Sequence, residues 1–170
     1  NAAKSMKGVM AKYPVYDKKL KKMVALQAMI NRHRKDKMGA KKMKWESDYM
    51  LGMAAFIGLQ SRGMPSNVSI SGPAKKFYEK GKAFYEQRRG LLDMSCKQCH
   101  VDNAGKMARS NLLSNGMPNG FPTFRLKWQK VGSLHRRFAG CNKNIRAKPY
   151  KRGSAEYTNL ELYLRHRANG

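Results

Sequence analysis

Acidic residues are scarce in this chain. Its 170 residues include 10 Asp and Glu against 36 Lys and Arg, which gives a formal net charge of +26. Residues 1–90 hold 21 basic and 6 acidic residues, and residues 91–170 hold 15 and 4, so no basic tail is appended to a neutral domain. A positive field over the whole molecule would attract small anions, acidic proteins or nucleic acid.

Long hydrophobic runs are also missing. The longest uncharged apolar run covers 13 residues, 49–61, whereas a membrane-spanning helix needs about 20. We therefore expect no membrane insertion. The chain begins with Asn1 rather than Met and has no charged-then-apolar leader, so we expect a processed or trimmed form from which any secretion signal has been removed.

Cysteine is rare and confined to the second half of the chain. Cys96, Cys99 and Cys141 are too few for a disulfide scaffold, so they are better interpreted as site chemistry. Hydrophobic residues make up 41% of the sequence and aromatic residues 9%, which is enough apolar material for a folded core. The length suits one ordinary domain or two small ones.

Hydrophobic periodicity predicts a mainly α fold. Helices are expected over residues 18–34 and 47–60, from residue 73 onward and from residue 154 onward. Residues 62–72 are rich in Gly, Pro and Ser and form the candidate domain boundary, and residues 110–123 are expected to form an extended loop. No strand pattern competes with these helices.

Residues 96–100 read CKQCH, the Cys-x-x-Cys-His pattern of c-type haem attachment. Two thiols one short turn apart can each bind a vinyl group of one porphyrin, and the next residue presents its imidazole to the iron. Cys96 and Cys99 would be the thioether links, and His100 the proximal ligand. A thioredoxin-like dithiol would need a preceding β-strand, and a zinc half-site would need a second ligand pair; neither context is present.

The flanking helices agree with a haem site. In cytochrome c folds, a helix with a small residue one turn from an aromatic residue precedes the motif, and a C-terminal helix crosses it there. Gly81 and Tyr85 before the motif, and Leu160, Tyr163 and Leu164 after it, match this arrangement. On their own these helices could equally be ordinary core helices.

The sixth iron ligand has two kinds of candidate. A methionine thioether is the default for an electron carrier, and Met107 and Met117 are the best placed in sequence. The competing candidate is Cys141, which has Arg136, Arg137, Lys143 and Arg146 within five residues. Such a basic setting favours the thiolate, which is both a nucleophile and a metal ligand.

Three segments carry a resemblance to a known family. RRGLLDMSCKQCHVDNAGK, NGFPTFRLKWQKVGSLHRRFAGCN and the terminal LELYLRHR resemble the catalytic haem domain of the SoxA family, the haem-carrying subunits of L-cysteine S-thiosulfotransferase. The similarity extends upstream through QSRGMP and GPAKKFYEKGKAFYEQRRG, and more weakly to KMVALQAMINRHR. It covers most of the chain.

The resemblance implies a specific activity. SoxA proteins work in the periplasm with a small monohaem cytochrome, SoxX, as a heterodimer, and join thiosulfate oxidatively to a cysteine of the carrier protein SoxYZ. The family's haem c has His and Cys axial ligands, which correspond to His100 and Cys141, and that cysteine is often a persulfide. The family's arginines correspond to Arg137 and to Arg167, with Arg165 a near alternative.

The resemblance also implies two cytochrome c-like domains, with residues 1–66 haem-free and residues 67–170 carrying the one haem. Many SoxA proteins hold a second haem in the N-terminal half, but no cysteine precedes Cys96 here. Two other functions remain as alternatives. One is a simple electron-transfer cytochrome with His/Met ligation. The other is a nucleic-acid-binding protein, which the charge alone suggests but which no recognition motif supports.

Overall fold

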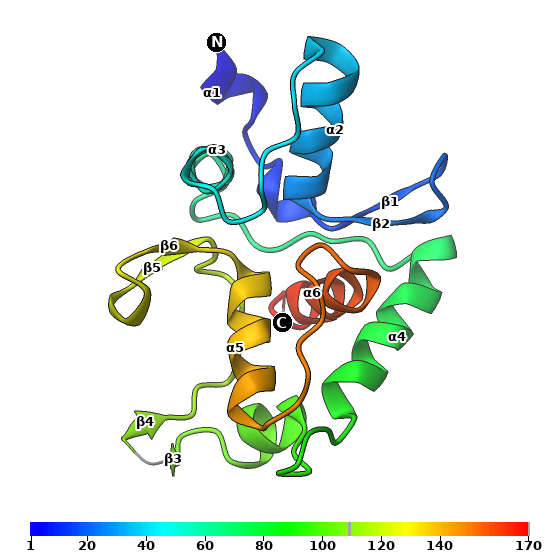
Figure 1. The fold of residues 1–170 in the computed structure, drawn as a ribbon. Helices are drawn as coiled ribbons and strands as arrows, with labels where there is room; N and C mark the ends of the chain where they lie inside the picture. The colour runs from blue at the N-terminus through cyan, green and yellow to red at the C-terminus, as the bar shows by residue number, and fades with distance from the viewer. Residues whose placement is uncertain (109, 170) are drawn as a thin grey trace.

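Helices dominate the computed structural model, which describes residues 1–108 and 110–169 (Figure 1). The N-terminal layer contains α1 (Ala2–Ser5), η1 (Met10–Lys12), the hairpin of β1 (Val15–Asp17) and β2 (Lys22–Val24), α2 (Leu26–Met38) and α3 (Asp48–Leu59). The remainder contains η2 (Gly72–Ala74), α4 (Lys75–Glu86), η3 (Gln98–Asp102), β3 (Met107–Ala108), β4 (Asn111–Leu112), β5 (Thr123–Arg125), η4 (Leu126–Trp128), β6 (Lys130–Gly132), α5 (Leu134–Asn144) and α6 (Ala155–Arg167). The expected mainly α fold is confirmed.

Helices α4 and α6 pack against each other at Gly81, as the sequence predicted (Figure 1). A Cβ atom at Gly81 would overlap the backbone carbonyl of Asn159 and lie 3.0 Å from Cβ of Tyr163. Helix α6 starts as expected, because the Ser154 hydroxyl accepts a hydrogen bond from the Tyr157 N–H at 3.3 Å. The glycine thus permits a close crossing of the two helices.

The main hydrophobic core lies where α4, α5 and α6 meet. Its buried members are Phe84, Tyr85, Leu134, Phe138, Tyr157, Leu160 and Leu164. Cys96 and Tyr163 pack against this cluster. The core therefore forms a rigid backing directly behind the first motif cysteine.

The N-terminal layer has its own buried cluster, and a third cluster joins the two parts. The N-terminal cluster contains Met10, Leu26, Ile30, Met50, Ala54 and Ile57. The joining cluster contains Met23, Val68, Ala74 and Leu162. Because Met23 comes from β2 and Leu162 from α6, the N-terminal hairpin packs directly on the C-terminal helix.

The prediction of a helix over residues 18–34 is wrong at its start. The Asp17 carboxylate accepts a hydrogen bond from the Leu20 N–H at 2.9 Å and pairs with Arg32, and Lys21 adopts a positive φ of 49°. This turn reverses the chain into β2, and α2 begins only at Leu26. Local periodicity cannot show this, because Met23 is buried by residues far along the chain.

Helix α3 has the expected N-cap, since Ser47 accepts a hydrogen bond from the Met50 N–H at 3.4 Å. One side of this helix faces the core, where Met50, Leu51, Ala54 and Ile57 are buried. The exposed side also carries large apolar side chains: Tyr49, Met53, Phe56 and Leu59. Within the described residues, every helix is too short or too polar to span a bilayer.

The N-terminal layer also holds the start of α5. Ser133 caps this helix through a 3.1 Å hydrogen bond from the Arg136 N–H, and Glu46 accepts hydrogen bonds from both the backbone N–H and the hydroxyl of Ser133. Next to it, Trp45 stacks on His135 with ring centroids 5.0 Å apart. Residues before the predicted boundary therefore position the helix that carries Cys141.

A buried polar network fixes α5 against α6. His135 Nε2 and Glu161 Oε2 are 3.1 Å apart, and His135 Nδ1 accepts a hydrogen bond from the Gly153 N–H at 2.9 Å. Burial alone would raise the pKa of Glu161, but the hydrogen bond from His135 and the charge of Arg165 lower it overall. Arg165 is therefore buried in the core as part of this network.

Candidate functional site

The motif turn is closed by a capping box. Ser95 Oγ accepts a hydrogen bond from the Gln98 N–H at 3.1 Å, and Gln98 Oε1 accepts one from the Ser95 N–H at 2.8 Å. The Asn103 amide then donates to the Gln98 carbonyl at 2.8 Å. Reciprocal bonds of this kind fix the start of a helical turn, so they hold Cys96 and Cys99 in one conformation.

His100 has one ring nitrogen engaged and the other left for a ligand. Its Nδ1 lies 2.7 Å from the Ser114 carbonyl oxygen, so in the neutral ring Nδ1–H donates and Nε2 keeps its lone pair. Burial lowers the pKa of His100, and the charges of Arg137 and Arg167 lower it further, against the Ser114 bond. The neutral imidazole is the form that binds a metal.

Gly116 packs against the ring of His100. A Cβ atom at this position would lie 2.8 Å from Cγ and 3.1 Å from Nδ1 of the histidine, and the φ of Gly116 is 74°, a conformation that favours glycine. The segment that contains Ser114 and Gly116 therefore sets the orientation of the ring from the side opposite to Nε2.

We expect Gly116→Ala to disturb the ligation of His100. The added methyl group would push the ring away from the Ser114 carbonyl, so the visible spectrum of the haem-loaded protein should show a loss of low-spin signal. Gly105→Ala is the matched control, because Gly105 also has a positive φ, 83°, but a Cβ atom there meets nothing within 4 Å. Equal spectra for the two variants would contradict this role for Gly116.

Cys141 lies on α5, within electrostatic range of both motif thiols. All three cysteines are free and half-buried. Burial, with smaller contributions from Cys141 and Cys99, raises the pKa of Cys96 to about 12. The pKa of Cys99 is also raised, by burial and then by Cys141. A thioredoxin-like dithiol needs the opposite shift, toward a stable thiolate, so that alternative does not fit.

The zinc alternative lacks its ligands. In the described ranges, 1–108 and 110–169, no group of three or more His, Cys, Asp or Glu side chains is arranged to hold a metal ion.

The segment before the motif also differs from that of a thioredoxin-like site. It consists of α4 and a tight turn in which the backbones of Arg89 and Met94 pair, so no strand leads into the motif as a thioredoxin-like site would require.

Arg89 ties the motif turn to the helix that carries Cys141. Its guanidinium lies 4.9 Å from the ring centroid of Phe84 and 4.8 Å from that of Tyr150. It also donates a hydrogen bond to the Asn142 side chain, and Asn142 is buried beside Cys141. This contact fixes the relative positions of the motif and α5.

The structure separates the two candidate arginines of the last helix. Arg165 is buried and its Nε lies 3.7 Å from the Glu161 carboxylate, whereas Arg167 faces the motif side. Arg167 Nη1 donates to the Tyr85 hydroxyl at 2.8 Å and to the Asn115 carbonyl at 3.2 Å. Arg167 and Arg137 both act on the pKa of His100, so the structure brings these two predicted residues to one site.

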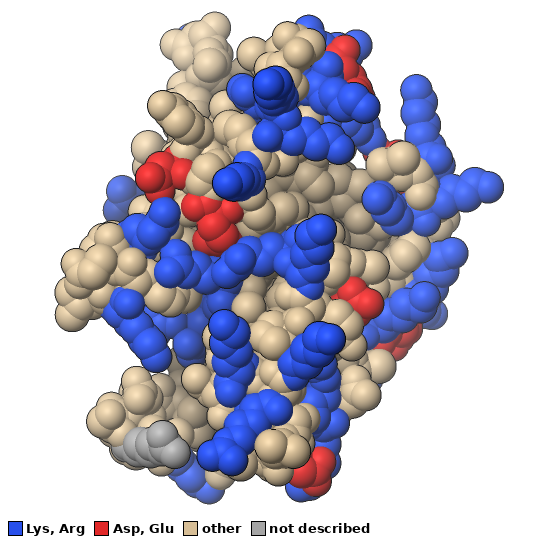
Figure 2. All heavy atoms as spheres, viewed as in Figure 1, with Lys and Arg blue, Asp and Glu red and all other residues tan. Residues whose placement is uncertain are grey.

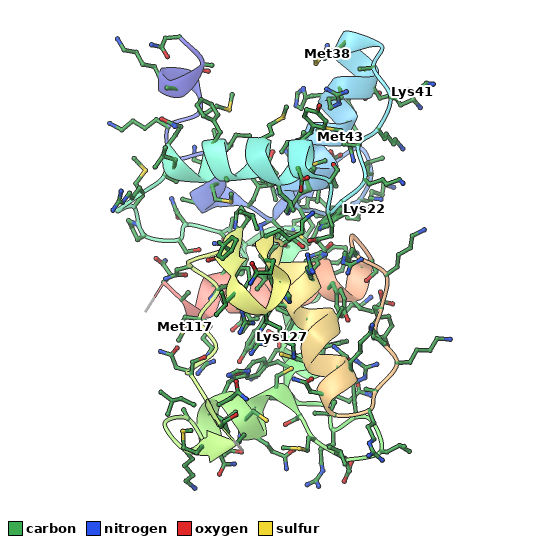
Figure 3. The ribbon with its side chains drawn as sticks, turned by 60° about the vertical axis from the view of Figure 1, so that its left-hand side comes forward. Lys22, Met38, Lys41, Met43, Met117 and Lys127 are labelled. Atoms are coloured by element: carbon green, nitrogen blue, oxygen red, sulfur yellow. The ribbon has the colours of Figure 1, made fainter. Side chains whose placement is uncertain are left out.

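The methionine candidates are poorly placed for a distal ligand. Met107 lies in the β3–β4 hairpin with 62% of its surface exposed, and Met117 follows Gly116 on the segment that supports His100. Figure 3 places Met38 and Met43 in the N-terminal layer, at the end of the molecule opposite to η3. Cys141 is the candidate that lies within electrostatic range of both motif cysteines.

Sequence reasoning missed several residues of this site. The capping box could have been found, because Ser95-x-x-Gln98 is a recognised local pattern. Ser114 and Gly116 give no such signal, because their role depends on contact with His100 across an irregular segment. Arg125 was also missed. Burial and then the charge of Arg137 lower the pKa of Arg125, while the charge of Cys141 raises it, so Arg125 lies within electrostatic range of both groups.

Lys and Arg side chains cover both layers of the face shown in Figure 2, and acidic side chains are few. The basic surface is therefore not confined to the site. The positive field of such a surface favours the approach of anions.

These residues fit a covalently bound haem. Two free thiols flank a fixed turn, a neutral imidazole has one nitrogen available, and a thiol on a neighbouring helix could supply a second ligand. The fold and site define a c-type cytochrome domain. The chain belongs to the SoxA/TsdA cytochrome c domain family, whose pattern matches residues 1–66 and 80–170.

Curated relatives and a solved structure agree with this assignment. The chain is 44% identical over 166 residues to the L-cysteine S-thiosulfotransferase subunit SoxA of Paracoccus pantotrophus, covering 98% of this chain and 57% of that protein. It is 41% identical over 165 residues to the same subunit of Rhodovulum sulfidophilum, covering 97% of this chain and 58% of that protein. A chain in the crystal structure of SoxXA from P. pantotrophus superposes with a TM-score of 0.94 at 43% identity, covering 99% of this chain and 64% of that one.

The chain thus spans less than two thirds of the length of these relatives. The expected family is confirmed. The alignments with these relatives cover nearly the whole of this chain, so they include the motif region and the last two helices.

Proposed function

We propose that this chain is the haem-carrying part of a SoxA-type L-cysteine S-thiosulfotransferase. The observation that supports the proposal is that Cys141 lies within electrostatic range of Cys96 and Cys99, while Arg137 and Arg167 lie within electrostatic range of His100. The names of the relatives support the same activity. An electron-transfer cytochrome with His/Met ligation is the weaker alternative, because Met107 and Met117 are poorly placed.

The proposed roles follow from side-chain chemistry. Cys96 and Cys99 would bind one haem c covalently, and His100 and Cys141 would ligate its iron. When bound, the haem supplies an iron that holds a thiolate and exchanges single electrons. Cys141 is also the reactive sulfur, as a thiolate or as a persulfide.

Thiosulfate is a dianion, and Arg137 and Arg167 hold its oxygen atoms, because planar guanidinium groups suit oxyanions. Arg167 has one nitrogen engaged with Tyr85 and Asn115, which fixes its position, and its other N–H groups can serve the substrate. In a two-electron oxidation, the sulfur on Cys141 forms a bond to the terminal sulfur of thiosulfate, and the electrons leave to a second cytochrome subunit. A carrier thiolate then attacks that terminal sulfur, the bond to the Cys141 sulfur breaks, and the Cys141 sulfur leaves as an anion.

The overall reaction is an oxidation. One thiol of the carrier and one thiosulfate lose two electrons and one proton as a new sulfur–sulfur bond forms between them. The electrons go to a second cytochrome subunit of the SoxX type, and the carrier is of the SoxYZ type. The crystal structure that matches this chain is titled as SoxXA, which supports a SoxX-type partner. The proposed location is the periplasm.

We also propose that residues 1–66 are a haem-free cytochrome c-like domain and residues 67–170 the haem domain. Residues 1–66 contain no cysteine and therefore no thioether site. They have a buried cluster of their own, and Trp45 and Glu46 contact α5. Support of the catalytic helix would be one function that this domain keeps without a haem.

A conjugation assay tests the proposed function. The haem-loaded protein with a SoxX-type subunit and an electron acceptor should transfer thiosulfate to a carrier peptide that ends in cysteine, seen as added mass on the peptide. Because the reaction releases two electrons, two molecules of a one-electron acceptor should be reduced for each peptide modified. A protein that reduces the acceptor with thiosulfate but never modifies the peptide would contradict the proposal.

A further inference from the structure

Trp128 holds two arginines on the β5–β6 hairpin. The guanidinium of Arg125 lies 5.2 Å from its ring centroid, and that of Arg136 lies 4.7 Å from it. The ring itself rests on Gly132, where a Cβ atom would overlap it. Since Arg125 and Lys130 are also paired across the hairpin, Arg125 has a fixed position rather than the freedom of a surface arginine.

Trp128 holds the partly buried side chain of Arg125 close to Arg136, near the start of α5, and this helix also carries Arg137 and Cys141. The electrostatics agree with this location, because burial and the charge of Arg137 lower the pKa of Arg125 and the charge of Cys141 raises it. Within residues 1–108 and 110–169, no carboxylate lies within 4.0 Å of the guanidinium of Arg125 or Arg137. Two neighbouring guanidinium groups without a counter-charge repel each other, and a bound anion would relieve this repulsion.

We propose that Arg125, positioned by Trp128, is a further oxyanion-binding residue of the Cys141 site and binds the sulfonate group of the substrate together with Arg137. This inference rests on the proposed function and extends its substrate site. The sulfonate oxygens accept hydrogen bonds from the two guanidinium groups, while the terminal sulfur points to Cys141. Arg136 and Gly132 act through Trp128 and are positioning residues.

The expected effect is on binding rather than on the chemical step. Because hydrogen bonds to charged groups are comparatively strong, Arg125→Gln in the haem-loaded complex should weaken thiosulfate binding and raise KM about tenfold, with kcat nearly unchanged. Arg125→Lys keeps the charge and should give an intermediate value. Arg62→Gln removes the same charge from an exposed position and should match the wild type.

Equilibrium binding of sulfate, an oxyanion that cannot be conjugated, gives a readout without turnover. Calorimetry should show about tenfold weaker sulfate binding for Arg125→Gln and no change for Arg62→Gln. Equal binding by the wild type and Arg125→Gln would overturn the inference. So would an altered haem content or reduction potential with unchanged anion binding, because Arg125 would then hold a haem carboxylate.

The two proposals can fail separately. Suppose that the wild type conjugates no thiosulfate but binds sulfate, and that Arg125→Gln binds sulfate more weakly. The proposed function is then wrong, while the oxyanion site is supported. If the wild type conjugates thiosulfate and Arg125→Gln does so with the same KM, the further inference is wrong. If Arg125→Gln does not fold, sulfate binding and KM are measured on Arg125→Lys instead, because lysine retains the positive charge over Trp128. Values equal to those of the wild type would then overturn the inference.

Discussion

Replacing Cys141 by methionine is expected to reduce conjugation of thiosulfate by more than about a thousandfold. The thioether can still ligate the haem iron, so the variant should keep one haem per chain. It has no thiolate, however, and cannot form the covalent link to thiosulfate. The measurement is the rate of mass increase of the carrier peptide, with haem content taken from the absorption spectrum of the same sample.

Met117→Leu is the matched control for this experiment. It removes the methionine that the electron-carrier alternative would place on the iron, at a position on the His100 side of the site. Neither the spectrum nor the conjugation rate should change. Normal conjugation by Cys141→Met, or a new spectrum in Met117→Leu, would remove Cys141 from its proposed role.

Gly81→Ala is expected to have the largest effect on stability. The new methyl group would overlap the carbonyl of Asn159, so α4 and α6 would have to move apart and open the core behind Cys96. Overpacking of a close contact usually costs about 1–3 kcal/mol, and a clash with backbone belongs at the upper end or beyond. For a chain of this size, the melting temperature should fall by about 10 °C.

Gly52→Ala provides the comparison on another helix. Gly52 lies in α3, and a Cβ atom there meets nothing within 4 Å. Alanine is the better helix former, so this variant should be equal to the wild type or more stable, by up to about 1 kcal/mol. Thermal melts followed by circular dichroism compare the two variants. Similar melting temperatures for the two variants would contradict the prediction, because α4 and α6 could then move apart at Gly81 without loss of stability.

The parts of the structure that sequence predicted well have local causes. The capped starts of α3 at Ser47 and of α6 at Ser154 follow from side-chain hydrogen bonds to nearby N–H groups. The crossing at Gly81 is nonlocal, but it was expected from the pairing of a small residue with an aromatic one before the motif. The motif at Cys96 and Cys99 depends only on spacing.

The parts that sequence missed depend on contacts between distant segments. The hairpin of β1 and β2 forms because the Asp17 turn reverses the chain and Met23 packs near Leu162. The helix that carries Cys141 is positioned by Glu46, which lies about half the chain away in sequence. Arg125 likewise lies near α5 because Trp128 contacts both Arg125 and Arg136, a nonlocal contact that follows from the way β6 leads directly into α5.

The electron paramagnetic resonance spectrum of the oxidised, haem-loaded protein tests the central claim most directly. That claim is that His100 and Cys141 would both ligate the haem iron. Low-spin haem with His and thiolate ligands gives a signal clearly different from that of His and Met ligands. We predict a thiolate signal that Cys141→Met abolishes and Met117→Leu leaves intact. A His/Met signal in the wild type would contradict the account.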